Sequence, residues 1–238
     1  MMYNNIKSPN FKKKARKTTE IRFIIIHYTG MQSKRVSLAR LIDKKSKVSC
    51  HYLIDRKGKV IKMVDDNKVA WHAGKSKWKK YVNLNKYSLG IELVNKGHQY
   101  GYEKFTFSQI NSLNEICKTL KKKYKIKDQN ILAHSDIAPT RKKDPGEKFP
   151  WFKIGKNFLI NSKKIKKVKE ISEFKIRKLF FKNLYKIGYR YFNLNSHSKT
   201  DKFLVKAFQR KYVQNNVNGL IDQKTYEISH FIVKNSKI

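Results

Sequence analysis

Two histidines and one aspartate have the residue types and positions of a metal site. His27 directly follows the apolar run 23–26. His134 likewise follows a short apolar run, 130–133, and Asp144 comes ten residues later. Each histidine therefore lies where a predicted strand enters a loop, a common place for functional side chains. Two imidazoles and one carboxylate would give zinc three ligands and leave a fourth position for water, although this set alone is not specific.

The apolar pattern around these residues predicts strands. Residues 23–26 form a continuous aromatic and β-branched run, which is typical of a strand buried on both faces. Residues 51–54 and 60–64 flank the turn-forming segment 55–59, and this arrangement predicts a hairpin. In the next predicted strand, 89–94, the leucine and isoleucine side chains share one face, so Glu92 points to the other.

A helix and a last short strand complete the first part of the chain. Residues 106–109 have the sequence of a capping box, which predicts the start of a helix. Its apolar side would consist of Ile110, Leu113, Cys117, Leu120 and Tyr124. Strands and helices thus alternate over the first 150 residues, which predicts one α/β domain.

The remaining chain predicts a linker and a small helical unit. Residues 153–170 are rich in lysine, and we interpret them as a linker. Apolar residues then recur at mostly helical spacing up to Gly188, a plausible helix stop: Phe174, Ile176, Leu179, Phe180 and Leu184. A second helix through 203–208, a turn at Gly219 and a third helix over 225–233 would give a three-helix domain at 171–236.

Local motifs around the candidate ligands are far more specific than the ligands themselves. Six occur in order: 25–29 (IIHYT), 51–55 (HYLID), 70–74 (AWHAG), 88–92 (SLGIE), 133–139 (AHSDIAP) and 142–151, which contains DPG and FPW. Over roughly residues 5–152 this series resembles the zinc-dependent N-acetylmuramoyl-L-alanine amidases of the amidase-2 family, in the AmpD/AmiD branch. The resemblance implies an α/β catalytic domain with a mixed central sheet flanked by helices.

The resemblance also implies roles for individual residues. One zinc ion would be held by His27, His134 and Asp144. Glu92 matches the catalytic glutamate, and Lys142 matches the catalytic lysine. The reaction would be hydrolysis of the amide bond between the lactyl group of N-acetylmuramic acid and L-Ala of the stem peptide, in cell-wall degradation, turnover or recycling. Glu92 could move the proton of the water, and Lys142 could stabilise the oxyanion.

Other histidines and aromatic residues have less certain roles. Trp71 and His72 could line a substrate groove or could be packing residues, and His51 could join them, although its place at the start of a strand favours a structural role. The remaining histidines, His98, His197 and His230, match nothing and are expected at the surface or in packing. The two cysteines provide no disulfide framework, and we expect both to be buried.

The C-terminal unit has a resemblance of its own. Residues 205–210 (VKAFQR) precede 217–222 (VNGLID) and Thr225, and the series resembles the peptidoglycan-binding three-helix domain that often follows such amidases. Asn218 stands where that family usually has aspartate. A helical appendage that only packs on the catalytic domain is the alternative.

Composition restricts the remaining possibilities. The 238 residues include 56 Lys or Arg and 17 Asp or Glu, so the formal net charge is +39. Because the excess is spread along the chain and arginine is scarce, we interpret it as compositional bias rather than as recognition of a specific nucleic acid. Two other functions stay open: a peptidoglycan-recognition protein that binds without cutting, and an accessory protein that binds polyanions.

The expected setting of the protein follows from the same sequence. No apolar run is long enough to span a membrane. The N-terminus has no apolar signal-peptide core, which favours the cytoplasm, whereas a wall-binding unit would favour the periplasm or cell wall. We expect a monomer whose partner is peptidoglycan or a muropeptide.

Overall fold

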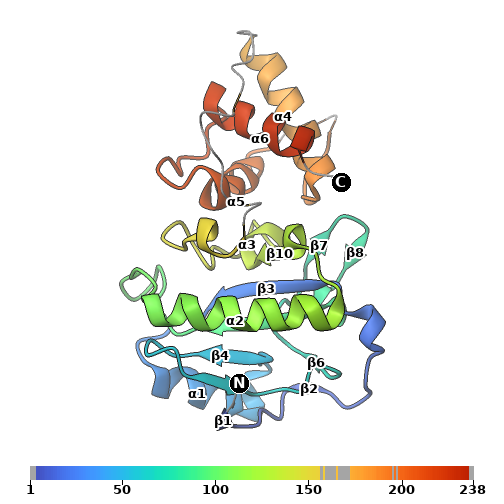
Figure 1. The fold of residues 1–238 in the computed structure, drawn as a ribbon. Helices are drawn as coiled ribbons and strands as arrows, with labels where there is room; N and C mark the ends of the chain where they lie inside the picture. Colours follow the sequence, from blue (N-terminus) through green and yellow to red (C-terminus); the bar gives the residue numbers. More distant parts are fainter. Residues whose placement is uncertain are drawn as a thin grey trace.

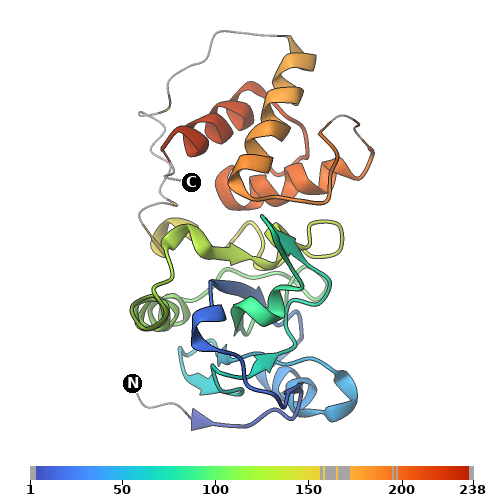
Figure 2. The same cartoon turned by 90° about the vertical axis from the view of Figure 1, so that its right-hand side faces the viewer.

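The computed structural model describes residues 4–155, 158, 165, 172–194, 196 and 198–235. An α/β part is followed by a helical part that lies beside it, as Figures 1 and 2 show. Most of the predicted linker 153–170 and the predicted surface residue His197 lie outside the described residues. Within the described part of the chain, no helix has the length and apolar content needed to cross a bilayer.

The α/β part is built on a mixed sheet, as predicted, and the sheet has six strands. The strands lie in the order β1 (Asn4–Asn5), β5 (Val60–Lys62), β4 (Tyr52–Ile54), β9 (Ser88–Leu93), β3 (Phe23–Tyr28) and β10 (Ile131–Ala133). Only β4 and β5, the predicted hairpin, pair antiparallel; the other neighbours are parallel. Small pairs flank the sheet: β2 (Phe11–Lys12) with β6 (Val69–Ala70), and β7 (Lys77–Trp78) with β8 (Tyr81–Val82).

The two central strands are buried in the way their sequences predict. In β3, Ile24, Ile25 and Ile26 are fully buried, so both faces of the strand are covered. In β9, the alternating leucine and isoleucine side chains lie in the core between the sheet and helix α2. Glu92 is half-buried and projects from the other face, on the same side as His27, its partner in the parallel register.

Helices cover the sheet. Helix α2 (Phe107–Tyr124) begins with the predicted capping box between Thr106 and Gln109. Helix α1 (Lys34–Ile42) was not expected, because among its residues only Ser37 and Leu41 are buried and its apolar pattern is weak. Among the described residues, five short 3-10 helices connect the elements: Thr18–Glu20, Lys44–Ser46, Leu84–Tyr87, Asp128–Asn130 and Trp151–Lys153.

One local prediction at the candidate ligands was wrong. His134 does not enter an open loop but is the first residue of a short helix, α3 (His134–Ile137). The carboxylate of Asp136 accepts a hydrogen bond from the Ala133 N–H at 2.8 Å, which closes this helical turn. A side chain three positions into a helix can cap its first residues in this way, so the turn holds His134 more firmly than a loop would.

The C-terminal part consists of α4 (Glu173–Ile187), α5 (Asp201–Tyr212) and α6 (Gln223–Asn235). Gly188 ends α4 with a φ of 141°, and a Cβ there would collide with the ring of Trp78. Phe174, predicted to be on the apolar side of the first helix, is instead 77% exposed. It lies in the first turn, where the neighbouring helices do not cover it.

One apolar cluster joins the two parts of the protein. Phe23 and Ile25, on the face of β3 that also carries His27, belong to the same buried cluster as Phe180 of α4 and Phe208 of α5. The β7–β8 hairpin extends toward the helices (Figure 2). Its Trp78 packs edge-on against Tyr189, with ring centroids 4.9 Å apart. The helical part therefore packs on the face of the sheet from which the candidate site projects.

Candidate metal centre and its cleft

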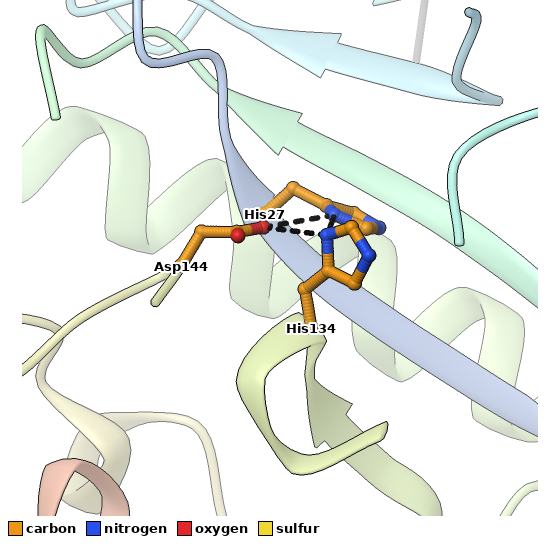
Figure 3. A group of neighbouring side chains, drawn as sticks. All are labelled: His27, His134 and Asp144. Carbon is orange, nitrogen blue, oxygen red and sulfur yellow. Dashed lines mark hydrogen bonds and ion pairs between the residues drawn. The ribbon is translucent and has the colours of Figure 1, made fainter. Parts of the chain in front are cut away.

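Three buried side chains converge on one point. His27 comes from the end of β3, His134 from the start of α3, and Asp144 from the loop that follows (Figure 3). The two Nδ1 atoms are 2.9 Å apart, and each lies 3.0 Å from Oδ2 of Asp144. All three residues are at most 6% exposed. The structure thus brings together the three side chains that the sequence singled out as a ligand set.

Their outer hydrogen bonds decide where the ring protons lie. Nε2 of His134 is 3.2 Å from the carbonyl oxygen of Ala73. Because a carbonyl only accepts, the proton of a neutral His134 lies on Nε2, and Nδ1 presents a lone pair toward His27 and Asp144.

A longer chain of hydrogen bonds determines which ring nitrogen of His27 carries the proton. The Ser88 hydroxyl donates to the carbonyl of Leu84, so its oxygen accepts from Nε2 of His72. Nδ1 of His72 must then accept from Nε2 of His27, 3.1 Å away. Nδ1 of His27 is left as a second lone pair.

Three lone-pair atoms this close together need a cation between them. Burial, together with the neighbouring His134, lowers the pKa of His27 to about 4, so this ring is neutral at neutral pH. Oδ2 of Asp144 adds a carboxylate oxygen at the same point, 3.0 Å from each Nδ1 atom. Ligands of a tetrahedral zinc ion lie roughly 3.3 Å apart, close to the separations seen here. The donor set therefore fits a metal ion.

Glu92 lies beside this centre. Within the described structure, its Oε2 is shielded from solvent and has no hydrogen-bond partner. Burial, and then the charge of Asp144, raise the pKa of Glu92 to about 8. A carboxyl group with a pKa near neutrality and a free oxygen can exchange protons with a bound substrate or water.

The centre opens into a cleft of about 780 Å³. Its walls include the predicted residues Trp71, His72, Glu92 and Lys142, together with His134 and Asp144. Lys142 is half-buried and Trp71 offers part of its ring to the cleft. A carboxyl group, an ammonium group and an aromatic surface thus face one space next to the ligand set.

Comparison with known proteins agrees with this geometry. The model of the amidase-2 family, described as N-acetylmuramoyl-L-alanine amidase, matches residues 17–147. The chain belongs to this family. The resemblance inferred from the six motifs is therefore confirmed for the α/β part.

Individual amidases extend the comparison. AmiD of Escherichia coli, an N-acetylmuramoyl-L-alanine amidase, is 41% identical over 143 residues, which are 55% of this chain and 51% of AmiD, so the match spans about half of that protein. AmpD of Haemophilus influenzae, a 1,6-anhydro-N-acetylmuramyl-L-alanine amidase, is 32% identical over 61% of this chain and 86% of its own length. The structure of E. coli AmiD with the substrate anhydro-N-acetylmuramic acid-L-Ala-D-γ-Glu-L-Lys superimposes with a TM-score of 0.75 at 28% identity, covering 94% of this chain and 91% of that one.

Two histidines predicted as substrate-binding residues, His51 and His72, lie in different positions relative to the cleft. His51 is fully buried and does not line the cleft; its Nδ1 accepts from the Gly90 N–H at 3.0 Å, so its role is structural. His72 does reach the cleft, but both its ring nitrogens are engaged with His27 and Ser88. A Cβ on Gly90 would collide with the His72 ring, which explains the glycine of the SLGIE motif.

Sequence reasoning missed several residues of the cleft. His98, expected at the surface or in packing, lines it and faces the hydroxyl of Tyr28, with 2.8 Å between Nδ1 and the oxygen. Arg141 lines it as well and donates to the carbonyls of Ala73 and Lys75. Tyr28 and Arg141 directly adjoin His27 and Lys142 in the sequence, and that adjacency was an available signal. His98 had none, because a loop folds it back onto Tyr28.

Proposed function

We propose that the chain is a zinc-dependent N-acetylmuramoyl-L-alanine amidase. It would hydrolyse the amide bond between the lactyl group of N-acetylmuramic acid and L-Ala of the stem peptide. The observation that carries this proposal is the three facing lone pairs of His27, His134 and Asp144, with the carboxyl group of Glu92 beside them. Metal-assisted amide hydrolysis combines such a Lewis-acid site with a group that moves protons.

Each residue would contribute a separate function. Zinc, when bound by His27, His134 and Asp144, supplies a Lewis acid that polarises the amide carbonyl and makes water acidic enough to ionise near pH ~7. Glu92 accepts a proton from the attacking water and delivers it to the departing amine nitrogen. The ammonium group of Lys142 stabilises the negative charge that develops on the carbonyl oxygen. Trp71 provides a flat apolar surface for the sugar.

The relatives support a substrate class. E. coli AmiD binds an anhydro-muramyl peptide, and H. influenzae AmpD is named for the anhydro sugar. We therefore propose that soluble anhydro-muropeptides are substrates of this chain. Intact peptidoglycan, which contains the same amide bond, would be a second substrate.

We also propose a division of the chain at residues 153–170. Residues 5–152 would form the catalytic domain and 171–236 a unit that adds affinity for polymeric peptidoglycan. The amide of the buried Gln209 side chain donates to Oδ1 of Asn218 and to the carbonyl of Leu220. These motif residues therefore stabilise the turn within the unit. Binding of purified protein to sacculi at moderate salt, which screens simple charge attraction, tests the affinity role.

The activity is tested by mass spectrometry of reaction products. Purified protein is incubated separately with anhydro-muramyl tetrapeptide and with intact sacculi, each with and without a chelator. We expect release of a stem peptide that begins with L-Ala, its loss in chelator, and its return when Zn²⁺ is added in excess. Binding of muropeptide without any release of stem peptide would identify a recognition protein instead. Undiminished turnover in chelator, with no metal found by elemental analysis, would rule out the zinc mechanism.

A further inference from the structure

The end of helix α5 contacts the segment that carries His134. Nζ of Lys211 lies 2.8 Å from Oδ2 of Asp136, and the two side chains are only 2% and 0% exposed. The hydroxyl of Tyr189 donates to Oδ1 of the same carboxylate at 2.6 Å. Lys211 also donates to the carbonyl of Ile131, the first residue of β10. A buried ion pair of this kind is tolerated only when further hydrogen bonds complete it, as they do here.

Asp136 connects that ion pair to the metal centre. It lies two residues after His134 and accepts the N–H of Ala133, the residue just before the ligand. The oxygen that closes this helical turn, Oδ2, is the same atom that receives Lys211. The position of the His134 imidazole therefore depends on a carboxylate that the helical part holds from outside.

The turn that follows α5 contacts the segment after Asp144. Nε2 of Gln214 donates to the carbonyls of Glu147 and Phe149, at 2.7 Å each. Glu147 is three residues after the ligand. The two ligand-bearing segments are also tied together directly, because the Ser135 N–H donates to the carbonyl of Asp144 at 3.0 Å.

These polar contacts come in addition to apolar packing between the two parts. One apolar cluster that includes Phe23, Ile25, Phe180 and Phe208 already spans the interface. Lys211 and Gln214 are three residues apart and bind two different segments, each next to a different ligand. Hydrogen bonds fix distance and direction, which apolar packing does not.

We propose that Lys211, at the C-terminal end of α5, and Gln214, in the turn that follows, position the segments bearing His134 and Asp144 for metal binding with the help of Tyr189. These are positioning residues, since none of them contacts the ligand atoms. The helical part is thus a component of the metal site and not only an attached binding unit. The inference rests on the proposed function only in taking zinc as the metal.

The test measures zinc affinity in single variants of the full chain. Lys211→Met removes the ammonium group, Tyr189→Phe removes one hydroxyl, and Gln214→Ala removes the bridging amide. Lys202→Met, on the exposed side of the same helix, is the matched control. Zinc is titrated into metal-free protein against a fluorescent chelator, and circular dichroism at the same temperature confirms folding. We expect affinity to fall about tenfold or more in Lys211→Met and several-fold in the two milder variants, because outer-shell partners commonly contribute 10–100-fold.

The outcomes separate the proposals. Affinity loss in the folded variants, with the KM for muropeptide unchanged and the control at wild-type affinity, supports positioning. Wild-type zinc affinity in folded Tyr189→Phe and Gln214→Ala overturns it, whether or not Lys211→Met folds. A wild-type chain that binds zinc but releases no stem peptide contradicts the proposed function and leaves the affinity comparison valid.

Discussion

His27 and Glu92 are partners in the parallel register of β3 and β9, so one strand supplies a metal ligand and its neighbour supplies the carboxyl group next to it. Side chains at paired positions of parallel strands project from the same face of the sheet. Because both strands are buried along their length, the distance between the two groups is set by backbone hydrogen bonds and not by a loop. This relationship makes the role of Glu92 separable from metal binding.

Replacing Glu92 with glutamine should abolish most turnover while leaving the metal in place. Glutamine keeps the size of the side chain but cannot take a proton, and acid–base assistance is typically worth about 10²–10⁴-fold in rate. We expect kcat to fall at least about a hundredfold, with one zinc per chain by elemental analysis. His27→Ala, in contrast, should lose the zinc. A Glu92→Gln enzyme with near wild-type kcat would exclude Glu92 as the proton carrier.

The raised pKa of Glu92 predicts that the free energy of unfolding of the metal-free protein depends on pH. The group has an ordinary pKa of 4.5 in the unfolded chain and about 8 in the folded protein. Between these values the folded state binds more protons, so the free energy of unfolding falls as pH rises from about 4.5 to about 8. Glu92→Gln should remove this pH dependence. Urea denaturation at pH 4 should show little difference between the variants, and at pH 9 the glutamine variant should be more stable by on the order of 2–4 kcal/mol.

His72 should act on zinc affinity and not on substrate affinity. It receives the Nε2 proton of His27, and removing such an outer partner typically weakens metal binding 10–100-fold. His72→Phe keeps a ring in the buried position but cannot accept that proton. His230→Phe, at an exposed position of α6, is the control. A chelator-competition titration in which both variants match the wild type would show that the His72–His27 contact does not orient the ligand.

Lys142 and Lys143 provide a direct comparison of two adjacent ammonium groups. Both line the cleft, but only Lys142 is half-buried, and it adds to the positive potential at Glu92. Losing an oxyanion donor typically costs ~10²–10³ in kcat. We expect that loss in Lys142→Ala and less than about threefold in Lys143→Ala, measured at saturating muropeptide. Equal effects of the two substitutions would indicate that only the local charge matters.

Much of the site could be predicted from the sequence because it depends on local patterns. The period of two in β9 correctly placed Glu92 away from the core, and the apolar runs correctly placed His27 and His134 at strand ends. The turn at His134 could not be predicted, because its capping carboxylate, Asp136, is held by a lysine 75 positions away. Such a contact leaves no periodic signal in either segment.

Burial also separates alternatives that the sequence left open. Of the two roles considered for His51, its burial and the hydrogen bond from the Gly90 N–H favour the structural one. Helix α1 was missed because a polar helix that buries only Ser37 and Leu41 shows no clear apolar period. Phe174 has the spacing of a core residue and lies one turn beyond the region that its neighbours cover.

The apolar cluster shared by Phe23, Ile25, Phe180 and Phe208 has a consequence for how the protein melts. Two halves with separate interiors can lose their structure in separate steps, whereas halves that share one interior expose it together. A calorimetric scan of the full chain should therefore show one heat-absorption peak whose calorimetric and van't Hoff enthalpies agree. A chimera that carries the helical half of a relative would fold only if the residues on the buried face of β3 were exchanged as well.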